Sequence, residues 1–142
     1  MASVRLDAFE VNLVATRPAF ASAFEELRRQ LDAFHLGRRT RFGVELVFEE
    51  VVSNVLRHGG RPDRVTHVSV KVAPEEAAVR LTFLDDGPPF DPRGWPEPPP
   101  AQVGGRGLML IRSVSSGMEY LRTPEGQNRL TVSVPSEWDT GA

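Results

Sequence analysis

Two pairs of strand-like segments, each joined by a short turn, restrict the fold of this chain more than any other feature of its sequence. The first pair covers residues 66–73 and 78–84, and the second covers residues 118–123 and 129–134. A turn of a few residues joins only antiparallel strands, because a parallel pair needs a crossover of a dozen or more residues. Both pairs therefore predict antiparallel hairpins and argue against a doubly wound parallel sheet.

Helical segments alternate with these hairpins. Thr16 offers an N-cap and Pro18 suits the first helical turn, so we expect a helix to begin there. Further helices are expected over about 40–58 and 108–115, and a first strand within 4–14. The apolar stripe that predicts the first helix consists of Phe20, Phe24, Leu27, Leu31 and Phe34. Interspersed helices and hairpins predict an α+β two-layer sandwich.

Composition excludes several kinds of function. The 142 residues suit a single domain, 1–142, and the absence of cysteine excludes disulfides, thiol catalysis and cysteine-based zinc sites. A net charge of −2 gives no general affinity for nucleic acid. No apolar run or signal-peptide pattern points to a membrane, so we expect a cytoplasmic protein. Lys71 is the single lysine among 17 Lys and Arg residues, so arginine or backbone N–H groups must bind any phosphate.

The second helical segment, ELVFEEVVSNVLRHGG, carries a candidate catalytic pair. Glu50 and Asn54 lie four residues apart at the border of the apolar face, whereas Glu49 falls on the polar side. An asparagine oxygen suits Mg²⁺ beside nucleotide phosphates. A carboxylate one turn away can take the proton from a hydroxyl that attacks the γ-phosphate. Taken alone, such a segment is more often a helix with solvated charges.

The stretch VRLTFLDDGPPFDP ends a predicted strand in two carboxylates. Alternation places Asp85 in line with the apolar residues of the strand and turns Asp86 to the other face. A carboxylate at the edge of an apolar pocket needs a hydrogen-bond donor, and an adenine amino group is a suitable one. Gly87 would let the backbone pass close to the base. An ordinary polar turn after the strand explains the same residues equally well.

A glycine-rich turn, Gly104 to Gly107, precedes the third helical segment and follows residues 87–103, whose prolines predict no regular structure. Glycines before a helix expose N–H groups and the positive end of the helix dipole, which together bind anions. Arg106 can add charge to such a phosphate site. The motif is weak alone, and its late position argues against a dinucleotide-binding fold. The sequence also has no P-loop and no HRD or DFG motif.

Together the three stretches resemble the N, G1 and G2 boxes of the GHKL (Bergerat-fold) ATPases. Their order and spacing are most similar to those of the bacterial anti-sigma-factor serine/threonine kinases. The resemblance covers most of the chain. It implies a mixed, mostly antiparallel sheet with about three helices on one face.

The resemblance also implies cofactors and roles. ATP and Mg²⁺ are expected, with Glu50 as general base, Asn54 as the Mg²⁺ ligand and Asp85 as the reader of adenine. In the closing strands, either Asn128 or Thr131 is expected near the adenine. Further nucleotide-binding positions follow from the same motifs, namely Arg57, His58, Gly87, Gly105, Gly107 and Leu108. Pro89 replaces the usual second glycine, and the short segment between the boxes argues against a large mobile lid.

Three functions fit these features. The leading hypothesis is a kinase that phosphorylates a STAS-domain anti-sigma-factor antagonist, with a sigma factor as the sequestered target. The first alternative is a non-catalytic anti-sigma module that binds its partner. The second is a detached histidine-kinase catalytic domain, which the lack of a preceding helix pair with a phosphoacceptor histidine disfavours. His35 is instead expected at a helix end. The sequence leaves open whether the chain forms a homodimer.

Overall fold

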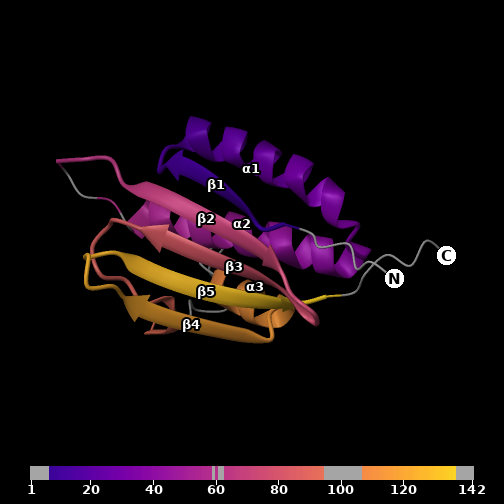
Figure 1. The fold of residues 1–142 in the computed structure, drawn as a ribbon. Coiled ribbons are helices and arrows are strands. Elements are labelled where there is room, and N and C mark those ends of the chain that lie inside the picture. The colour runs from indigo at the N-terminus through magenta and orange to yellow at the C-terminus, as the bar shows by residue number, and fades with distance from the viewer. Residues whose placement is uncertain (1–6, 59, 61–62, 95–106, 137–142) are drawn as a thin grey trace, which may run out of the picture.

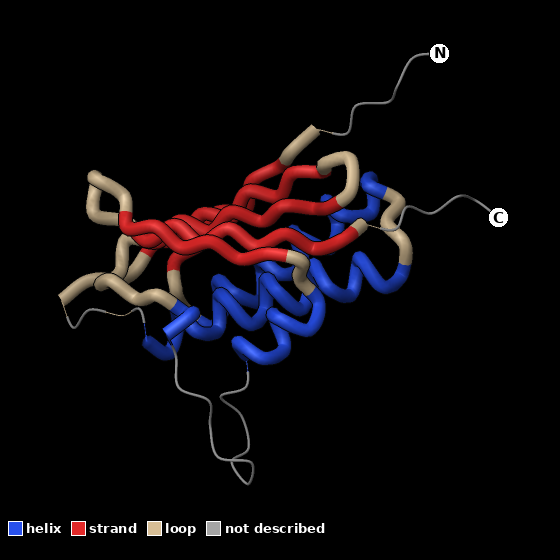
Figure 2. Tube along the Cα trace, turned by 90° about the horizontal axis from the view of Figure 1, so that it is seen from below, coloured by secondary structure: helices blue, strands red, loops and turns tan. Residues whose placement is uncertain are grey.

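Five strands and three α-helices form two layers, with the helices on one face of the sheet (Figures 1 and 2). The computed structural model describes residues 7–58, 60, 63–94 and 107–136. The strands are β1 (Phe9–Val14), β2 (His67–Pro74), β3 (Ala78–Asp85), β4 (Gly117–Arg122) and β5 (Asn128–Pro135). The helices are α1 (Arg17–Leu31), α2 (Arg38–His58) and α3 (Gly107–Val114), with 3₁₀ turns η1 (Asp32–Phe34) and η2 (Pro92–Gly94).

The strands follow the order β1-β2-β3-β5-β4, and each pairing between described strands is antiparallel. The two predicted hairpins are confirmed as β2–β3 and β4–β5, and the predicted α+β two-layer sandwich is confirmed with them. The described sheet is antiparallel throughout, whereas we expected a mixed one. Its register places Asp85, the last residue of β3, directly opposite Asn128, the first residue of β5.

Helix α1 begins as predicted. The Thr16 side chain accepts a hydrogen bond from the Ala19 N–H at 3.3 Å, which satisfies one of the free donors of the first turn. Phe20 and Phe24 pack against Phe48 of α2, with ring centroids 6.2 and 6.0 Å apart. These contacts bury the apolar stripe of α1 and fix its position against α2.

Helix α2 lies across β3 and β5, and two contacts fix its N-terminal half. The Thr40 hydroxyl donates a hydrogen bond to the Pro135 carbonyl at 2.9 Å. A Cβ atom at Gly43 would lie 2.9 Å from Cγ1 of Val134, so glycine allows α2 to approach β5 closely. Because α2 is rigid and held at this end, the position of its C-terminal half over the sheet is also defined.

A few boundaries differ from the predictions. Strand β1 begins at Phe9 rather than near residue 4, and residues 1–6 lie outside the described part. Residues 87–94, the described part of the proline-rich segment, include the turn η2 where we expected no regular structure, because proline fits the first turn of a helix. His35 ends η1 in a left-handed conformation with φ 51°, so it lies at a helix end as expected.

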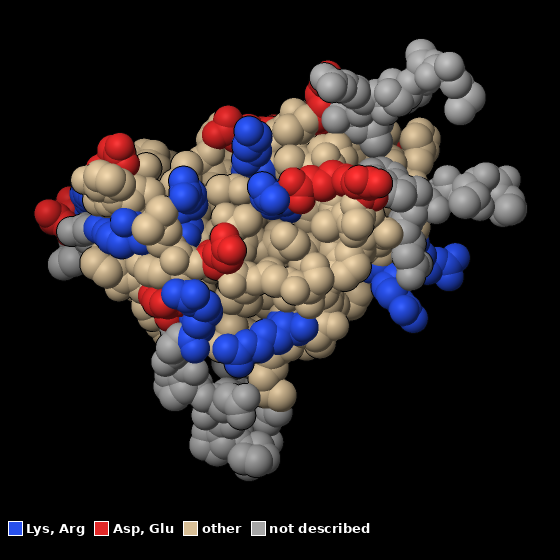
Figure 3. All heavy atoms as spheres, turned by 60° about the horizontal axis from the view of Figure 1, so that its bottom comes forward, with Lys and Arg blue, Asp and Glu red and all other residues tan. Residues whose placement is uncertain are grey.

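Basic and acidic side chains are interspersed on the face shown in Figure 3, in keeping with the small net charge. Within the described residues, none of the helices has both the length and the apolar character required to cross a membrane.

Candidate nucleotide site

A small cavity lies where the C-terminal half of α2 meets the adjacent ends of β3 and β5. Its volume is about 30 Å³, which is room for roughly two water molecules. A purine base is larger than this volume, so the Phe90 and Pro92 side chains that line the cavity must rearrange before a base can enter. The lining residues are Val51, Asn54, Val55, Phe83, Asp85, Phe90, Pro92, Tyr120, Asn128 and Leu130.

Asp85 supplies the carboxylate of this cavity. Its side chain is on the inward face of β3, and the residue is only 8% exposed. Oδ1 accepts hydrogen bonds from the Gly87 N–H at 3.0 Å and from Nδ2 of Asn128 at 2.9 Å. Among the described residues, we find no donor to Oδ2. Desolvation raises the pKa of Asp85, and the two hydrogen bonds oppose this rise by favouring the ionised form.

Asp86 points away from the cavity, as the strand alternation predicts. Its carboxylate accepts hydrogen bonds from the His67 N–H at 2.7 Å and from the His67 ring, with Nδ1 at 3.3 Å. Desolvation opposes the shift, but these bonds and the Arg64 charge together lower the pKa of Asp86. Asp86 therefore fastens the end of β3 to the start of β2, and Asp85 alone faces the cavity.

Glu50 and Asn54 lie together against Gly107, the first residue of α3, and of the two only Asn54 lines the cavity. A Cβ atom at Gly107 would lie 2.6 Å from Oε2 of Glu50 and 3.2 Å from Nδ2 of Asn54. A side chain at this position would therefore displace the Glu50 carboxylate. Because Asn54 lines the cavity that contains Asp85, it connects the two groups of predicted site residues.

The Asn54 amide is buried, with 7% of the residue exposed, and its Nδ2 has no hydrogen-bond partner within the described part of the chain. Buried amide groups normally have partners, so this one is available to a ligand. A half-turn of the amide presents its oxygen instead of its nitrogen. The side chain therefore fits the role of an oxygen ligand for Mg²⁺.

Glu50 is half-buried, and desolvation raises its pKa. The neighbouring Glu49 carboxylate also raises the pKa of Glu50, whereas the Arg57 charge lowers it. A carboxylate whose pKa is higher than usual is a stronger base once it has lost its proton. Glu49 is exposed, so the two neighbouring carboxylates differ in burial as the helical period predicts.

Arg57 and His58 are both exposed at the end of α2, but they lie beside different neighbours. The His58 ring is 5.4 Å from the Phe90 ring, next to the cavity. Arg57 lines a separate hollow with Thr16 and Arg17. The structure thus brings His58 toward the cavity, while Arg57 acts on the site through its charge beside Glu50.

The predicted glycine-rich positions are only partly described. Gly107 begins α3, and Leu108 is buried behind it with its side chain in the protein interior. The Leu108 backbone N–H belongs to the first helical turn, whose donors have no partner within the helix itself. Gly105 and Arg106 lie outside the described residues.

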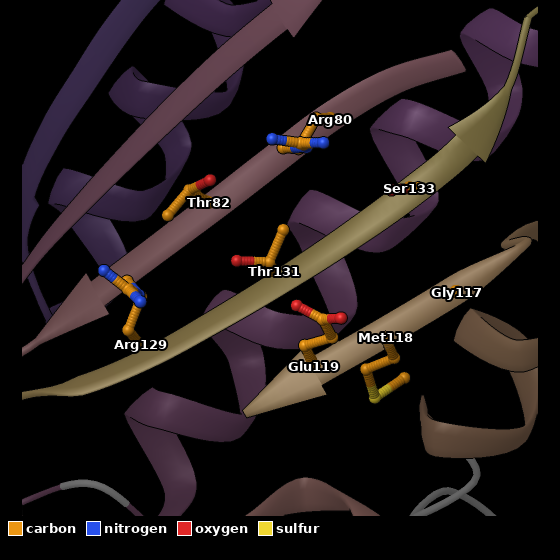
Figure 4. Close-up of a pocket in the computed structure, with 8 residues that line it drawn as sticks. All are labelled: Arg80, Thr82, Gly117, Met118, Glu119, Arg129, Thr131 and Ser133. Atoms are coloured by element: carbon orange, nitrogen blue, oxygen red, sulfur yellow. The ribbon is translucent and has the colours of Figure 1, made fainter. Parts of the chain in front are cut away.

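The structure decides between Asn128 and Thr131. Asn128 is on the inward face of β5, is 4% exposed and contacts Asp85 directly. Figure 4 shows Thr131 on the opposite, outer face of the sheet, beside Thr82 and between Arg80 and Arg129. Thr131 is therefore remote from the cavity, because two residues of one strand that are an odd number of positions apart have side chains on opposite faces of the sheet.

Tyr120 and Phe90 are two cavity residues that the sequence analysis missed. The Tyr120 hydroxyl donates a hydrogen bond to Oδ1 of Asn128, and the Phe90 N–H donates to the same oxygen at 3.2 Å. The Arg122 guanidinium donates to the Gly87 carbonyl at 2.8 Å. These contacts hold the segment after β3 over the cavity.

Comparison with known proteins identifies the family of the chain. Residues 13–134 match the sequence model of a family described as the histidine kinase-like ATPase domain. The serine/threonine-protein kinase BtrW of Bordetella bronchiseptica is 28% identical over 137 residues, which cover 92% of this chain and 94% of that protein.

Two solved structures share the fold. The RsbU and RsbW domains of Rv1364c from Mycobacterium tuberculosis superpose on 94% of this chain with a TM-score of 0.65 and 18% identity. This chain spans about a third of that structure, since it covers 35% of it. The catalytic domain of histidine kinase ThkA aligns with 94% of this chain and 99% of its own length, with a TM-score of 0.53 and 13% identity.

Proposed function

The chain belongs to the histidine kinase-like ATPase domain family, and we propose that it is an ATP-dependent serine/threonine kinase of the anti-sigma-factor type. One observation carries the proposal. Asn54 lines the cavity of Asp85 and also meets Gly107 beside Glu50, so a base-binding carboxylate and a basic carboxylate belong to one continuous site.

Adenine binding is assigned to the Asp85 side of the cavity. Oδ2, which has no donor among the described residues, accepts a hydrogen bond from the amino group of the base, and the apolar walls contact its ring. The flexibility of Gly87 allows the backbone to lie close to the base. His58 lies beside the Phe90 ring, which the base must displace.

The triphosphate is assigned to the N-terminal end of α3. The free N–H groups of Gly107 and Leu108 and the positive end of the helix dipole favour phosphate oxygens there. We include Gly105, Arg106 and Arg57 in the same phosphate-binding set, as the family motifs imply. This placement brings the γ-phosphate toward Glu50 and Asn54.

Asn54 is the residue that would hold Mg²⁺, together with phosphate oxygens of the nucleotide. Its buried, unpartnered amide supports this role. When bound, the ion neutralises charge on the β- and γ-phosphates. The protein groups then position the nucleotide and move the proton.

Glu50 is assigned as the general base of the transfer. It takes the proton from the serine or threonine hydroxyl of the substrate as the oxygen forms a bond to the γ-phosphorus. The bond between the γ-phosphorus and the bridging oxygen breaks, and ADP leaves with that electron pair. The proton passes from Glu50 to solvent afterwards. The raised pKa of Glu50 supports this use.

The proposed protein substrate is a STAS-domain anti-sigma-factor antagonist, and a sigma factor is the proposed sequestered target. Support for this assignment comes from the similarity to the serine/threonine-protein kinase BtrW over nearly the whole length of both chains, and from the motifs. The fold shared with an RsbW domain is consistent with the same class of partner.

The test is transfer of labelled γ-phosphate to a purified antagonist, with Glu50→Gln and Glu49→Gln compared with wild type. Loss of a general base is expected to slow transfer by about 10²–10⁴-fold in Glu50→Gln. Glu49 is exposed and its variant should transfer at the wild-type rate. Binding of the antagonist without transfer by the wild type would instead favour the non-catalytic anti-sigma module.

A further inference from the structure

We propose that Tyr120 and Asn128 are positioning residues that orient the Asp85 carboxylate, so that a single oxygen, Oδ2, selects a 6-aminopurine. The inference rests on the proposed binding of ATP at Asp85. It concerns the Tyr120 hydroxyl and the Asn128 amide, two polar groups that act on the nucleotide through Asp85.

The Asn128 amide has no capacity left for a ligand. Nδ2 donates to Oδ1 of Asp85 at 2.9 Å and to the Pro88 carbonyl at 2.8 Å. Oδ1 accepts from the Phe90 N–H at 3.2 Å and from the Tyr120 hydroxyl. These four bonds use both donors and both acceptor positions of the amide. Asn128 therefore supports the site and does not bind the base directly.

The orientation of the Asn128 amide is fixed by its partners. The Pro88 carbonyl can only accept a hydrogen bond, and the Phe90 N–H can only donate one. If the amide were turned by half a turn, its oxygen would face the Pro88 carbonyl and its amino group would face the Phe90 N–H. The amino group must therefore face Asp85.

This arrangement locks one oxygen of Asp85 and leaves the other for recognition. Oδ1 receives the Asn128 amino group and the Gly87 N–H, so rotation of the carboxylate would break two hydrogen bonds. Oδ2 faces the ligand as a pure acceptor. An amino group at position 6 of a purine satisfies it, whereas a 6-oxo group would bring two acceptors together.

Tyr120 completes the arrangement from the neighbouring strand. It lies on β4, pairs with Leu130 of β5, and reaches Asn128 through its hydroxyl while its ring lines the cavity. Without the hydroxyl, Oδ1 of Asn128 keeps only the Phe90 N–H as a donor. The amide and the carboxylate that it holds then gain rotational freedom.

The experiment measures the dissociation constants of ATP and of purine riboside triphosphate, which lacks the 6-amino group. The dissociation constant of purine riboside triphosphate divided by that of ATP reports the contact between the amino group and Asp85. We expect a ratio of at least about tenfold in the wild type, because hydrogen bonds to charged groups contribute strongly. In Tyr120→Phe, which keeps the ring, the ratio should fall at least about threefold toward unity. Thr131→Val removes a hydroxyl from the outer face and should leave the ratio unchanged.

A double-mutant comparison separates positioning from general weakening. In an Asp85→Ala background, which has neither the acceptor nor an opposing donor, the ratio should be near unity, and Tyr120→Phe should not change it further. A Tyr120→Phe variant that binds both nucleotides more weakly with an unchanged ratio would overturn the inference while leaving ATP binding intact. Failure of folded wild-type protein to bind ATP would overturn the proposed function and this inference together.

Discussion

Replacement of Asp85 by asparagine should strongly weaken nucleotide binding while leaving the protein at least as stable as the wild type at pH 7. Asn keeps an oxygen that can accept the hydrogen bonds of Gly87 and Asn128, so the local structure is preserved. It also removes a charge whose burial raises the pKa of Asp85 above its ordinary value of 3.8. A buried charge without its ligand costs stability, and the neutral variant avoids this cost.

The pH dependence follows from the direction of the shift. Because the folded-state pKa is raised, the folded protein binds the proton more tightly than the unfolded chain, so wild-type stability falls as pH rises from 3.8 through the folded-state value. The Asp85→Asn variant has no ionisable group at this position, so its stability lacks this pH dependence. The difference in Tm between variant and wild type should therefore be present at pH 7 and disappear below about pH 4.

The loss of binding combines two terms. A hydrogen bond to a charged acceptor contributes about 1.5–3 kcal/mol, and opposing donors at the former Oδ2 position cost a further 1–3 kcal/mol or so. The sum corresponds to a decrease in ATP affinity of roughly 10²- to 10⁴-fold. Titration calorimetry with ATP measures this loss, and thermal unfolding from pH 3 to pH 8 measures the stability.

Asp86→Asn is the matched control, because Asp86 bonds to His67 and faces away from the cavity. This variant should keep wild-type ATP affinity and lose stability at pH 7, since the lowered pKa of Asp86 reports a favourable interaction of its charge. Equal affinity losses in both variants, or a strongly destabilised Asp85→Asn protein, would refute the reasoning.

Three further predictions concern the phosphate end of the site. Gly107→Ala should slow phosphoryl transfer by about tenfold or more, because the new Cβ would displace the Glu50 carboxylate. The same variant should hardly change Tm. Gly117→Ala is the control in both the transfer and the melting assays, since its Cβ would meet no atom within 4 Å. Asn54→Ala should remove most of the Mg²⁺-dependent gain in ATP affinity, measured by titration with Mg²⁺ and with a chelator. The rate of phosphoryl transfer by the wild type should increase as pH rises through a Glu50 pKa above 4.5, because Glu50 must be ionised to act as a base. The pH–rate profile of Glu50→Gln should lack this increase.

Periodicity alone predicted the orientation of the two main carboxylates. The helical period separated Glu50 from Glu49, and the strand period separated Asp85 from Asp86, because each element buries one face. The same rule could have decided between Asn128 and Thr131. Asn128 shares its face with the alternating apolar residues of β5, whereas Thr131 does not.

Tyr120 and Phe90 could not be predicted in this way. Strand β4 has the sequence GMEYLR, whose weak alternation does not distinguish its faces, and all its residues are at least partly exposed. The contact of Tyr120 with Asn128 depends on the register between β4 and β5. The place of Phe90 depends on how Asn128 and Arg122 hold the segment after β3. Both are tertiary features, set by pairings that a single sequence does not reveal.

A crystal structure with Mg²⁺ and a non-hydrolysable ATP analogue tests the central claim most directly. The account predicts the adenine amino group on Oδ2 of Asp85, with Phe90 displaced outward to admit the base. It also predicts the triphosphate at the start of α3, and the γ-phosphate within reach of Glu50 and Asn54. An analogue bound elsewhere, or with its base turned away from Asp85, would contradict the account.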